Sequence, residues 1–166
     1  MSYTPVPGAT PSPISTGRPT ASPGPTFSLA PQPTGPSAEI EVLVSGGDFD
    51  GSYRAVTAGA CVSEPAQNTF TVSYASDVAA DGFVALRLVL RDAALAQEDA
   101  SSEFLVEMSL GGPGGGVSYA LDPAQDEGEG DAFLDITDHD ATVDLSVIAP
   151  DETIIDLTVI CELVAP

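Results

Sequence analysis

The sequence predicts an all-β fold, an antiparallel β-sandwich of eight or nine short strands. Apolar and polar residues alternate with a period of two in many short segments after residue 38, which is the pattern of half-buried strands. Gly- or Asp-rich turns separate these segments, as is typical of sandwiches and barrels. Two cysteines, one early and one late in the β region, suit a single disulfide that staples the fold.

The alternation defines the predicted strands in order along the chain. Each has apolar side chains on one phase and polar or small side chains on the other, so each is expected to bury one face. One further strand, 52–57, is expected on weaker alternation. The predicted strands are 39–44, 52–57, 69–74, 84–91, 103–110, 117–121, 134–136, 143–147 and 155–161.

The register of two neighbouring strands can be predicted because opposed residues of an antiparallel pair have a constant index sum. Setting Leu88 opposite Val106 aligns the apolar positions of the segments 84–91 and 103–110. The same alignment places Arg87 opposite Glu107 and Arg91 opposite Glu103. Since the apolar face and the charges favour one register, we predict this pairing and two cross-strand ion pairs on its outer face.

Two further registers follow by the same reasoning. Placing Met108 opposite Tyr119 extends the pair into a three-stranded meander across the glycine-rich loop 111–116. Placing Val147 opposite Ile155 predicts a hairpin whose loop, centred on residues 150–152, has three or five residues.

The chain divides at residue 38 into two regions of different composition. Residues 1–38 contain ten of the fifteen prolines, no acidic residue and one base, Arg18. Such a segment cannot bury enough apolar surface to offset the entropy of ordering, so we expect a disordered, extended tether. Residues 39–166 are expected to form the acidic β-sandwich domain.

The charge of the domain limits its partners. The formal net charge is −21, and all 25 acidic residues follow residue 38. Nucleic acids are excluded as partners, because their affinity comes from Lys and Arg, and anionic membrane surfaces are excluded for the same reason. No apolar stretch reaches the roughly 18 residues of a membrane span. A protein or cell-envelope partner remains possible, as does a surface charged only for solubility.

The two cysteines predict the compartment. Cys161 lies on the inward phase of the last predicted strand, and Cys61 follows an early one, so we predict a Cys61–Cys161 disulfide rather than two buried free thiols. A disulfide implies an oxidising compartment. The start of the chain has no basic and apolar leader. The protein is therefore expected at the cell surface or outside the cell, with its signal peptide removed.

The segment 45–53 (SGGDFDGSY), Cys61 and the terminal strand 156–161 (DLTVIC) resemble small bacterial secreted and lipid-anchored β-sandwich proteins. In layout they are similar to the mycobacterial 19 kDa lipoprotein antigen. The resemblance implies a compact domain with one disulfide, carried on a Ser/Thr/Pro-rich segment that follows a lipidated cysteine. That cysteine is absent from residues 1–38, and the resemblance implies no catalytic or binding residues.

One acidic loop, 122–131, is the candidate metal site. Calcium takes six to eight oxygen ligands from flexible carboxylates and carbonyls. Asp126, Glu127, Glu129 and Asp131, with glycines between them, could supply several of these ligands. The loop lacks the ligand spacing of an EF-hand, and the alternative is a solvated acidic loop. No other cofactor is predicted.

No catalytic set is evident. His139 is the only histidine, and no Gly-x-Ser-x-Gly motif or tryptophan occurs. We therefore expect a non-enzymatic extracellular or cell-surface module that binds a partner or has a structural role. The alternatives are an assembly subunit of a filament, surface layer or capsid whose tail docks on a neighbour, and a calcium-dependent adhesion module.

Overall fold

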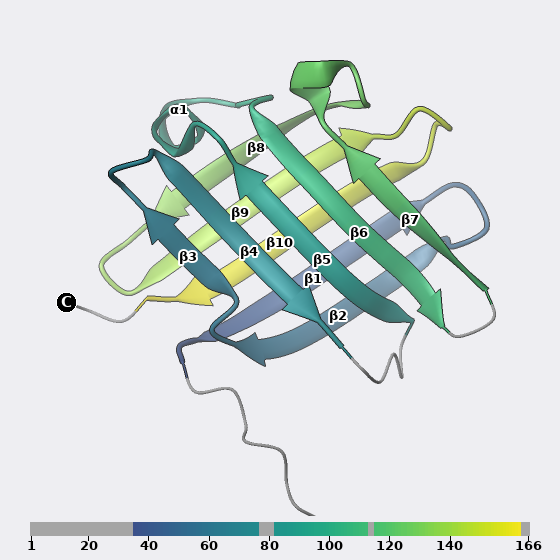
Figure 1. The fold of residues 1–166 in the computed structure, drawn as a ribbon, viewed down its shortest axis with the longest axis horizontal. Coiled ribbons are helices and arrows are strands. Elements are labelled where there is room, and N and C mark those ends of the chain that lie inside the picture. The colour runs from purple at the N-terminus through teal and green to yellow at the C-terminus, as the bar shows by residue number, and fades with distance from the viewer. Residues whose placement is uncertain (1–34, 77–81, 113–114, 164–166) are drawn as a thin grey trace, which may run out of the picture. The chain divides into compact units, whose positions relative to one another are not determined.

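The computed structural model describes residues 35–76, 82–112 and 115–163 (Figure 1). These residues form two five-stranded antiparallel sheets packed face to face, with one disulfide, which confirms the predicted sandwich. The strands of the two sheets cross each other when viewed through the sandwich. The predicted tether lies outside the described residues except for 35–38, of which 37 and 38 already belong to the first strand, β1 (Ser37–Ser45).

Ten strands and one α-helix make up the described domain. Sheet A has the order β2-β1-β10-β9-β8, and sheet B has the order β3-β4-β5-β6-β7. The strands of sheet A are β1 (Ser37–Ser45), β2 (Gly51–Ala58), β8 (Glu129–Ile136), β9 (Asp140–Ile148) and β10 (Ile154–Glu162). Those of sheet B are β3 (Cys61–Glu64), β4 (Thr69–Ala75), β5 (Phe83–Leu90), β6 (Phe104–Gly112) and β7 (Gly115–Leu121).

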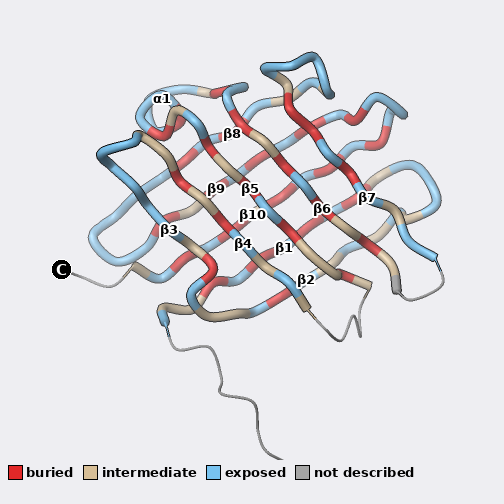
Figure 2. Tube along the Cα trace, viewed as in Figure 1, coloured by how far each residue is buried: buried red, intermediate tan, exposed pale blue. Residues whose placement is uncertain are grey.

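The core lies between the sheets and is built by the predicted alternation. Along β1, Ile40, Val42 and Val44 are buried while Glu39 and Glu41 are exposed. Figure 2 shows an alternation of buried and exposed positions along most of the other strands, β3 excepted. Burying one such aliphatic side chain stabilises the fold by about 1.5–3 kcal/mol.

All three predicted registers are confirmed. Leu88 lies opposite Val106, Met108 opposite Tyr119, and Val147 opposite Ile155. Strands β5, β6 and β7 therefore form the predicted meander. The β9–β10 loop, 149–153, has the longer of the two predicted lengths.

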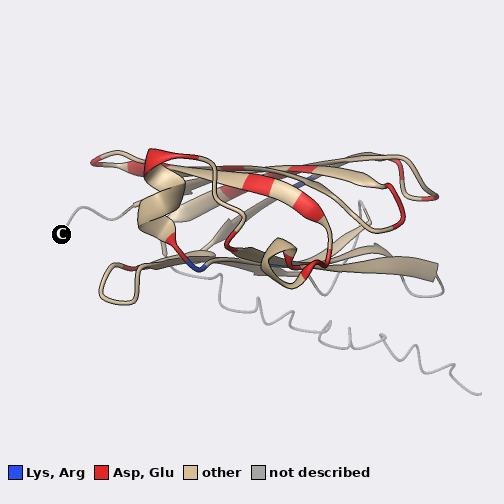
Figure 3. Cartoon of the chain, turned by 90° about the horizontal axis from the view of Figure 1, so that it is seen from above, with Lys and Arg blue, Asp and Glu red and all other residues tan. Residues whose placement is uncertain are grey.

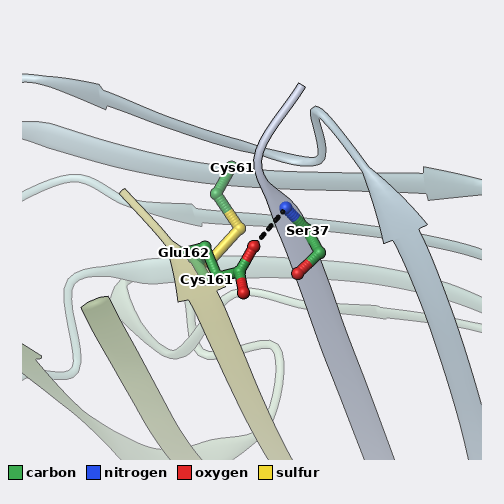
Figure 4. Close-up of a disulfide and its surroundings, with 4 residues drawn as sticks. All are labelled: Ser37, Cys61, Cys161 and Glu162. Atoms are coloured by element: carbon green, nitrogen blue, oxygen red, sulfur yellow. Dashed lines mark hydrogen bonds between the residues drawn. A yellow bond between two sulfur atoms is a disulfide. The ribbon is translucent and has the colours of Figure 1, made fainter. Parts of the chain in front are cut away.

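The predicted disulfide is also confirmed. It joins Cys61, at the start of β3, to Cys161 in β10, with a Cα–Cα distance of 6.2 Å. Because β3 is in sheet B and β10 in sheet A, the bond links the two sheets covalently (Figure 4). Beside it, the Ser37 amide N–H donates to Glu162 Oε2 at 3.2 Å, and the Ser37 hydrogen bonds lower the pKa of Glu162.

Two short elements differ from the prediction. Strand β3 was missed because it has four residues and no buried apolar alternation. The helix α1 (Ala93–Glu98) was missed because it has less than two turns. Its N-cap is Asp92, whose Oδ1 accepts from the Leu95 amide at 2.9 Å and from Asn68 Nδ2 at 2.8 Å. These bonds lower the pKa of Asp92.

The glycine-rich loop is shorter than predicted because its glycines continue the strands. Strand β6 runs to Gly112 and β7 starts at Gly115, while residues 113–114 lie outside the described residues. Gly111 has φ +96°, and a Cβ there would lie 2.5 Å from the Gly115 carbonyl oxygen. The close pairing of β6 and β7 at this end therefore requires glycine.

Candidate functional site

The predicted pair of Arg87 and Glu107 lies on the outer face of sheet B. Arg87 Nη1 is 2.7 Å from Glu107 Oε2, and both side chains are about half exposed. An exposed pair of this kind contributes about 0.2–1 kcal/mol. It is an ordinary cross-strand contact of β5 and β6.

The predicted pair of Arg91 and Glu103 is wrong. Arg91 Nη1 and Nη2 instead donate to Asp122 Oδ1 and Oδ2, at 2.8 and 2.5 Å. Glu103 contributes its backbone carbonyl oxygen, which accepts from the Arg91 amide at 2.8 Å. Arg91 pairs with Asp122 because a carboxylate at the end of β7 meets the planar guanidinium with both oxygens.

The Arg91–Asp122 pair links the end of β5 to the end of β7 in the three-stranded meander. The Asp122 side chain is only 9% exposed, against 37% for Arg91. The hydrogen bond from Arg91 lowers the pKa of Asp122, against the opposing effect of burial. Asp122 also precedes the 3-10 turn η1 (Pro123–Gln125). The register argument missed it because Asp122 directly follows β7, which lies two strands away from β5.

The structure does not bring the four predicted calcium ligands together. Glu129 and Asp131 belong to the start of β8, on its exposed phase, whereas Asp126 follows η1 and Glu127 forms a bridge with Asp122. In the described ranges, no group of three or more His, Cys, Asp or Glu side chains is placed to hold a metal ion. The strand start was missed because its inward positions are small.

The acidic side chains gather on one sheet. The strands of sheet A carry nine acidic residues and one arginine, Arg54, whereas those of sheet B carry two acidic residues and Arg87. All nine side chains of sheet A lie on its exposed phase. Figure 3 shows this imbalance between the two layers. The outer face of sheet A is therefore strongly anionic.

The same face also exposes most of the large apolar side chains that lie outside the core. Seven of the nine described exposed large hydrophobic residues are in strands of sheet A. Charged and apolar side chains are thus interleaved on one surface rather than segregated. The seven residues are Leu43, Val56, Phe133, Ile136, Ile148, Ile154 and Ile160.

An open groove of about 530 Å³ crosses β8, β9 and β10 on this face. Phe133, which is 51% exposed, and Ile148, which is 46% exposed, provide its apolar surface. Four carboxylates line it, with no base among its lining residues. They are those of Glu129, Asp131, Asp144 and Asp156.

Hydroxyl groups fix two of these carboxylates in position. Thr158 Oγ1 donates to Asp144 Oδ1 at 2.8 Å, and Ser146 Oγ donates to Asp156 Oδ1 at 2.6 Å. The groove therefore offers an apolar contact surface surrounded by oriented hydrogen-bond acceptors. It suits a ligand with cationic donors and apolar side chains.

Sequence reasoning missed the groove, although a signal for it exists. Phe133, Ile148 and Ile154 occupy the outward phase of their strands, where polar residues are expected. Large apolar side chains on that phase of a half-exposed strand indicate a contact surface. The sequence alone could not show that three separate strands bring these residues onto one face.

The chain matches no family model, no curated protein and no solved structure. Among the described residues, no helix has the length and apolarity of a membrane span. A β-sandwich by itself specifies no activity. The argument for function therefore depends on the chemistry of the surfaces described above.

Proposed function

We propose that this protein is a non-enzymatic binding module, at the cell surface or outside the cell. The outer face of sheet A would dock a basic protein or cell-envelope partner. The proposal rests on one observation, the exposed apolar side chains set among nine carboxylates on that face. A face charged only for solubility has no need of exposed Phe133 and Ile148.

The two kinds of side chain would have different roles in binding. The carboxylates of sheet A attract a cationic partner over a Debye length, about 10 Å at 0.1 M salt, and raise its association rate. Phe133 and Ile148 would then bury apolar surface against the partner and slow its dissociation. Affinity should therefore fall as salt is added, without disappearing.

The proposed compartment is supported by the disulfide, which requires an oxidising environment to form and persist. Alkylation of native protein isolated without reductant tests it. Cys61 and Cys161 should resist labelling until a reductant is added. Two thiols that label freely in the native protein would place it in a reducing compartment.

A defined peptide pair tests the binding face. Calorimetric titration with a synthetic peptide of alternating Lys and Leu should show binding, and a Glu/Leu peptide of equal length should not bind. Asp131→Asn and Phe133→Ser should each weaken binding by roughly tenfold, the typical effect of an interface contact. Val62→Ser, which removes an exposed apolar side chain from sheet B, is the matched control. Equal weakening by the control would refute the assignment.

A second candidate function, that of a structural assembly subunit, is favoured by a separate observation. Strand β7 is an edge strand without any charged residue.

A further inference from the structure

Strand β7 is an unprotected sheet edge. Natural proteins guard edge strands with charges, proline or short length, because an open edge is a template for another strand. The edge strand β2 carries Arg54, β8 carries three acidic residues, and β3 has only four residues. Strand β7, with sequence GGVSYAL, has seven residues and neither charge nor proline.

The free backbone groups of β7 can be identified from its neighbours. The Arg91 amide donates to the Glu103 carbonyl at 2.8 Å, and the Gly111 amide donates to the Gly82 carbonyl at 2.6 Å. Odd-numbered residues of β6 therefore turn their backbone groups toward β5, and even-numbered ones turn toward β7. By the alternation of an antiparallel ladder, residues 116, 118 and 120 of β7 face away from β6.

The side chains at this edge leave room for another backbone. A Cβ added at Gly115 would meet nothing within 4 Å, so packing within the described domain does not require glycine there. Glycine in a strand often marks the close approach of another chain. Nearby, Val117 is only half-buried, next to the buried Tyr119. The inner face of sheet B is thus incompletely covered at β7.

We propose that residues 26–30 of a neighbouring copy add to β7 as a sixth strand of sheet B. This segment, TFSLA, is the part of residues 1–34 that best matches a strand. It has no proline, and its large apolar residues, Phe27 and Leu29, alternate with small ones. Strand addition of this kind gains affinity from main-chain hydrogen bonds and specificity from alternate side chains. Phe27 and Leu29 would cover the inner-face positions beside β7.

We assign the added strand to a neighbouring copy because each chain enters its own domain at the edge of sheet B opposite to β7. The Gly59 amide donates to the Pro36 carbonyl at 2.9 Å, and Gly59 lies in the two-residue connection from β2 to β3, the strand at the opposite edge of sheet B from β7. Four strand spacings separate these edges, about 19 Å. Residues 31–36 span about 20 Å at most, so segment 26–30 of the same chain could reach β7 only along a straight, fully extended path, whereas a neighbouring copy has no such restriction.

The net charge of the protein determines how self-association through β7 depends on salt. Segment 26–30 and β7 are both uncharged, whereas each copy carries a formal charge of −21. Repulsion between copies opposes association, and salt screens it. Self-association should therefore become stronger at high salt, opposite to the salt dependence of binding at sheet A.

Sedimentation velocity of the full chain over a range of concentrations, at low and high salt, tests the proposal. The wild type should form larger species with rising concentration. Ser118→Pro removes an outward N–H without breaking the pairing with β6, and it should weaken association at least tenfold. Ser118→Ala, which loses only the exposed hydroxyl contact with Ser109, should associate like the wild type.

Ser52→Pro is the matched control on the other sheet. Ser52 is an exposed serine of edge strand β2, and the bond from Gly59 to Pro36 places its N–H on the outer side as well. This variant should keep wild-type association. The paired change Phe27→Asp and Leu29→Asp, in the full chain, should abolish association while leaving the melting temperature of the monomer unchanged.

Three results would overturn the proposal. A wild-type chain that stays monomeric at every concentration and salt level would do so. If the Ser118→Pro variant is folded by circular dichroism and still associates, β7 is excluded as the edge to which the neighbouring segment adds. Association that is lost in Ser118→Pro but kept in the Phe27/Leu29 variant would mean that β7 pairs with β7 of another copy.

Discussion

Replacing Cys61 and Cys161 together by alanine removes the covalent link between the two sheets. The double change leaves no unpaired thiol and introduces a small side chain at both positions. Cys161 is fully buried, and the bond joins edge strand β3 to the central strand β10 of the other sheet. We expect this variant to fold into the same sandwich with much lower stability.

The size of the loss follows from the loop that the bond closes. The cysteines are 100 positions apart, and closing a loop of that length restricts the unfolded chain by about 4.7 kcal/mol in the chain-entropy model. For a compact unit of about 130 residues, each kcal/mol corresponds to about 4 °C in melting temperature. The variant should therefore melt roughly 15–20 °C lower than the wild type.

Urea unfolding followed by far-ultraviolet circular dichroism measures this loss directly, since the chain has no tryptophan. The slope of the free energy of unfolding against urea should rise in the variant, because the unfolded state is no longer cross-linked and exposes more surface. Wild-type protein unfolded in reductant is the control and should resemble the variant. A loss below about 1 kcal/mol would refute the stabilising role assigned to the disulfide.

Three further predictions concern the Arg91–Asp122 pair, two glycines and the acidic loop. Arg91→Leu should destabilise the domain at pH 7 by on the order of 1 kcal/mol. Because the folded pKa of Asp122 is lowered below its unfolded value of about 3.9, this contribution is present above pH 4 and disappears as the pH falls through the folded pKa. Urea unfolding at pH 7 and at a series of acid pH values should show a cost that is full at pH 7 and shrinks as the pH falls. Gly130→Ala should cost about 1–3 kcal/mol, since its Cβ would overlap the Ser146 carbonyl oxygen. Gly115→Ala should leave the melting temperature nearly unchanged, because a Cβ there meets nothing within 4 Å; equal effects would contradict the packing described. Millimolar calcium or a chelator should shift the melting temperature by less than about 1 °C. A ligand of the native state must raise stability, but the side chains of Asp126, Glu127, Glu129 and Asp131 do not converge on one site. A clear rise in melting temperature with calcium would restore the hypothesis of a calcium-dependent adhesion module.

The alternation of apolar residues was sufficient to predict most of the fold. It gave the strands with large inward side chains, such as β1 and β5, and the registers followed because apolar positions and charges agreed. It failed where inward positions are small. In β8, Gly130 and Ala132 face inward, so the strand start at Glu129 was predicted to be a metal-binding loop. Where the inward residues are glycine or alanine, neither strand propensity nor apolar alternation identifies the strand.

The surfaces were less predictable than the core. Pairwise register could place Arg87 opposite Glu107, but it could not detect Asp122, which reaches Arg91 from a strand that does not pair with β5. The groove on sheet A is formed by three strands, of which only β9 and β10 were predicted to pair, so the outward Phe133 and Ile148 remained isolated residues in the sequence. Both features depend on tertiary arrangement rather than on local pattern.

Mapping of amide chemical shifts during titration of the full chain with the Lys/Leu peptide tests the central claim most directly. The claim is that the outer face of sheet A is the binding surface. We predict that the perturbed amides cluster in β8, β9 and β10 around Phe133 and Ile148, with those of sheet B unchanged. Perturbations centred on sheet B, or spread evenly over both sheets, would contradict it.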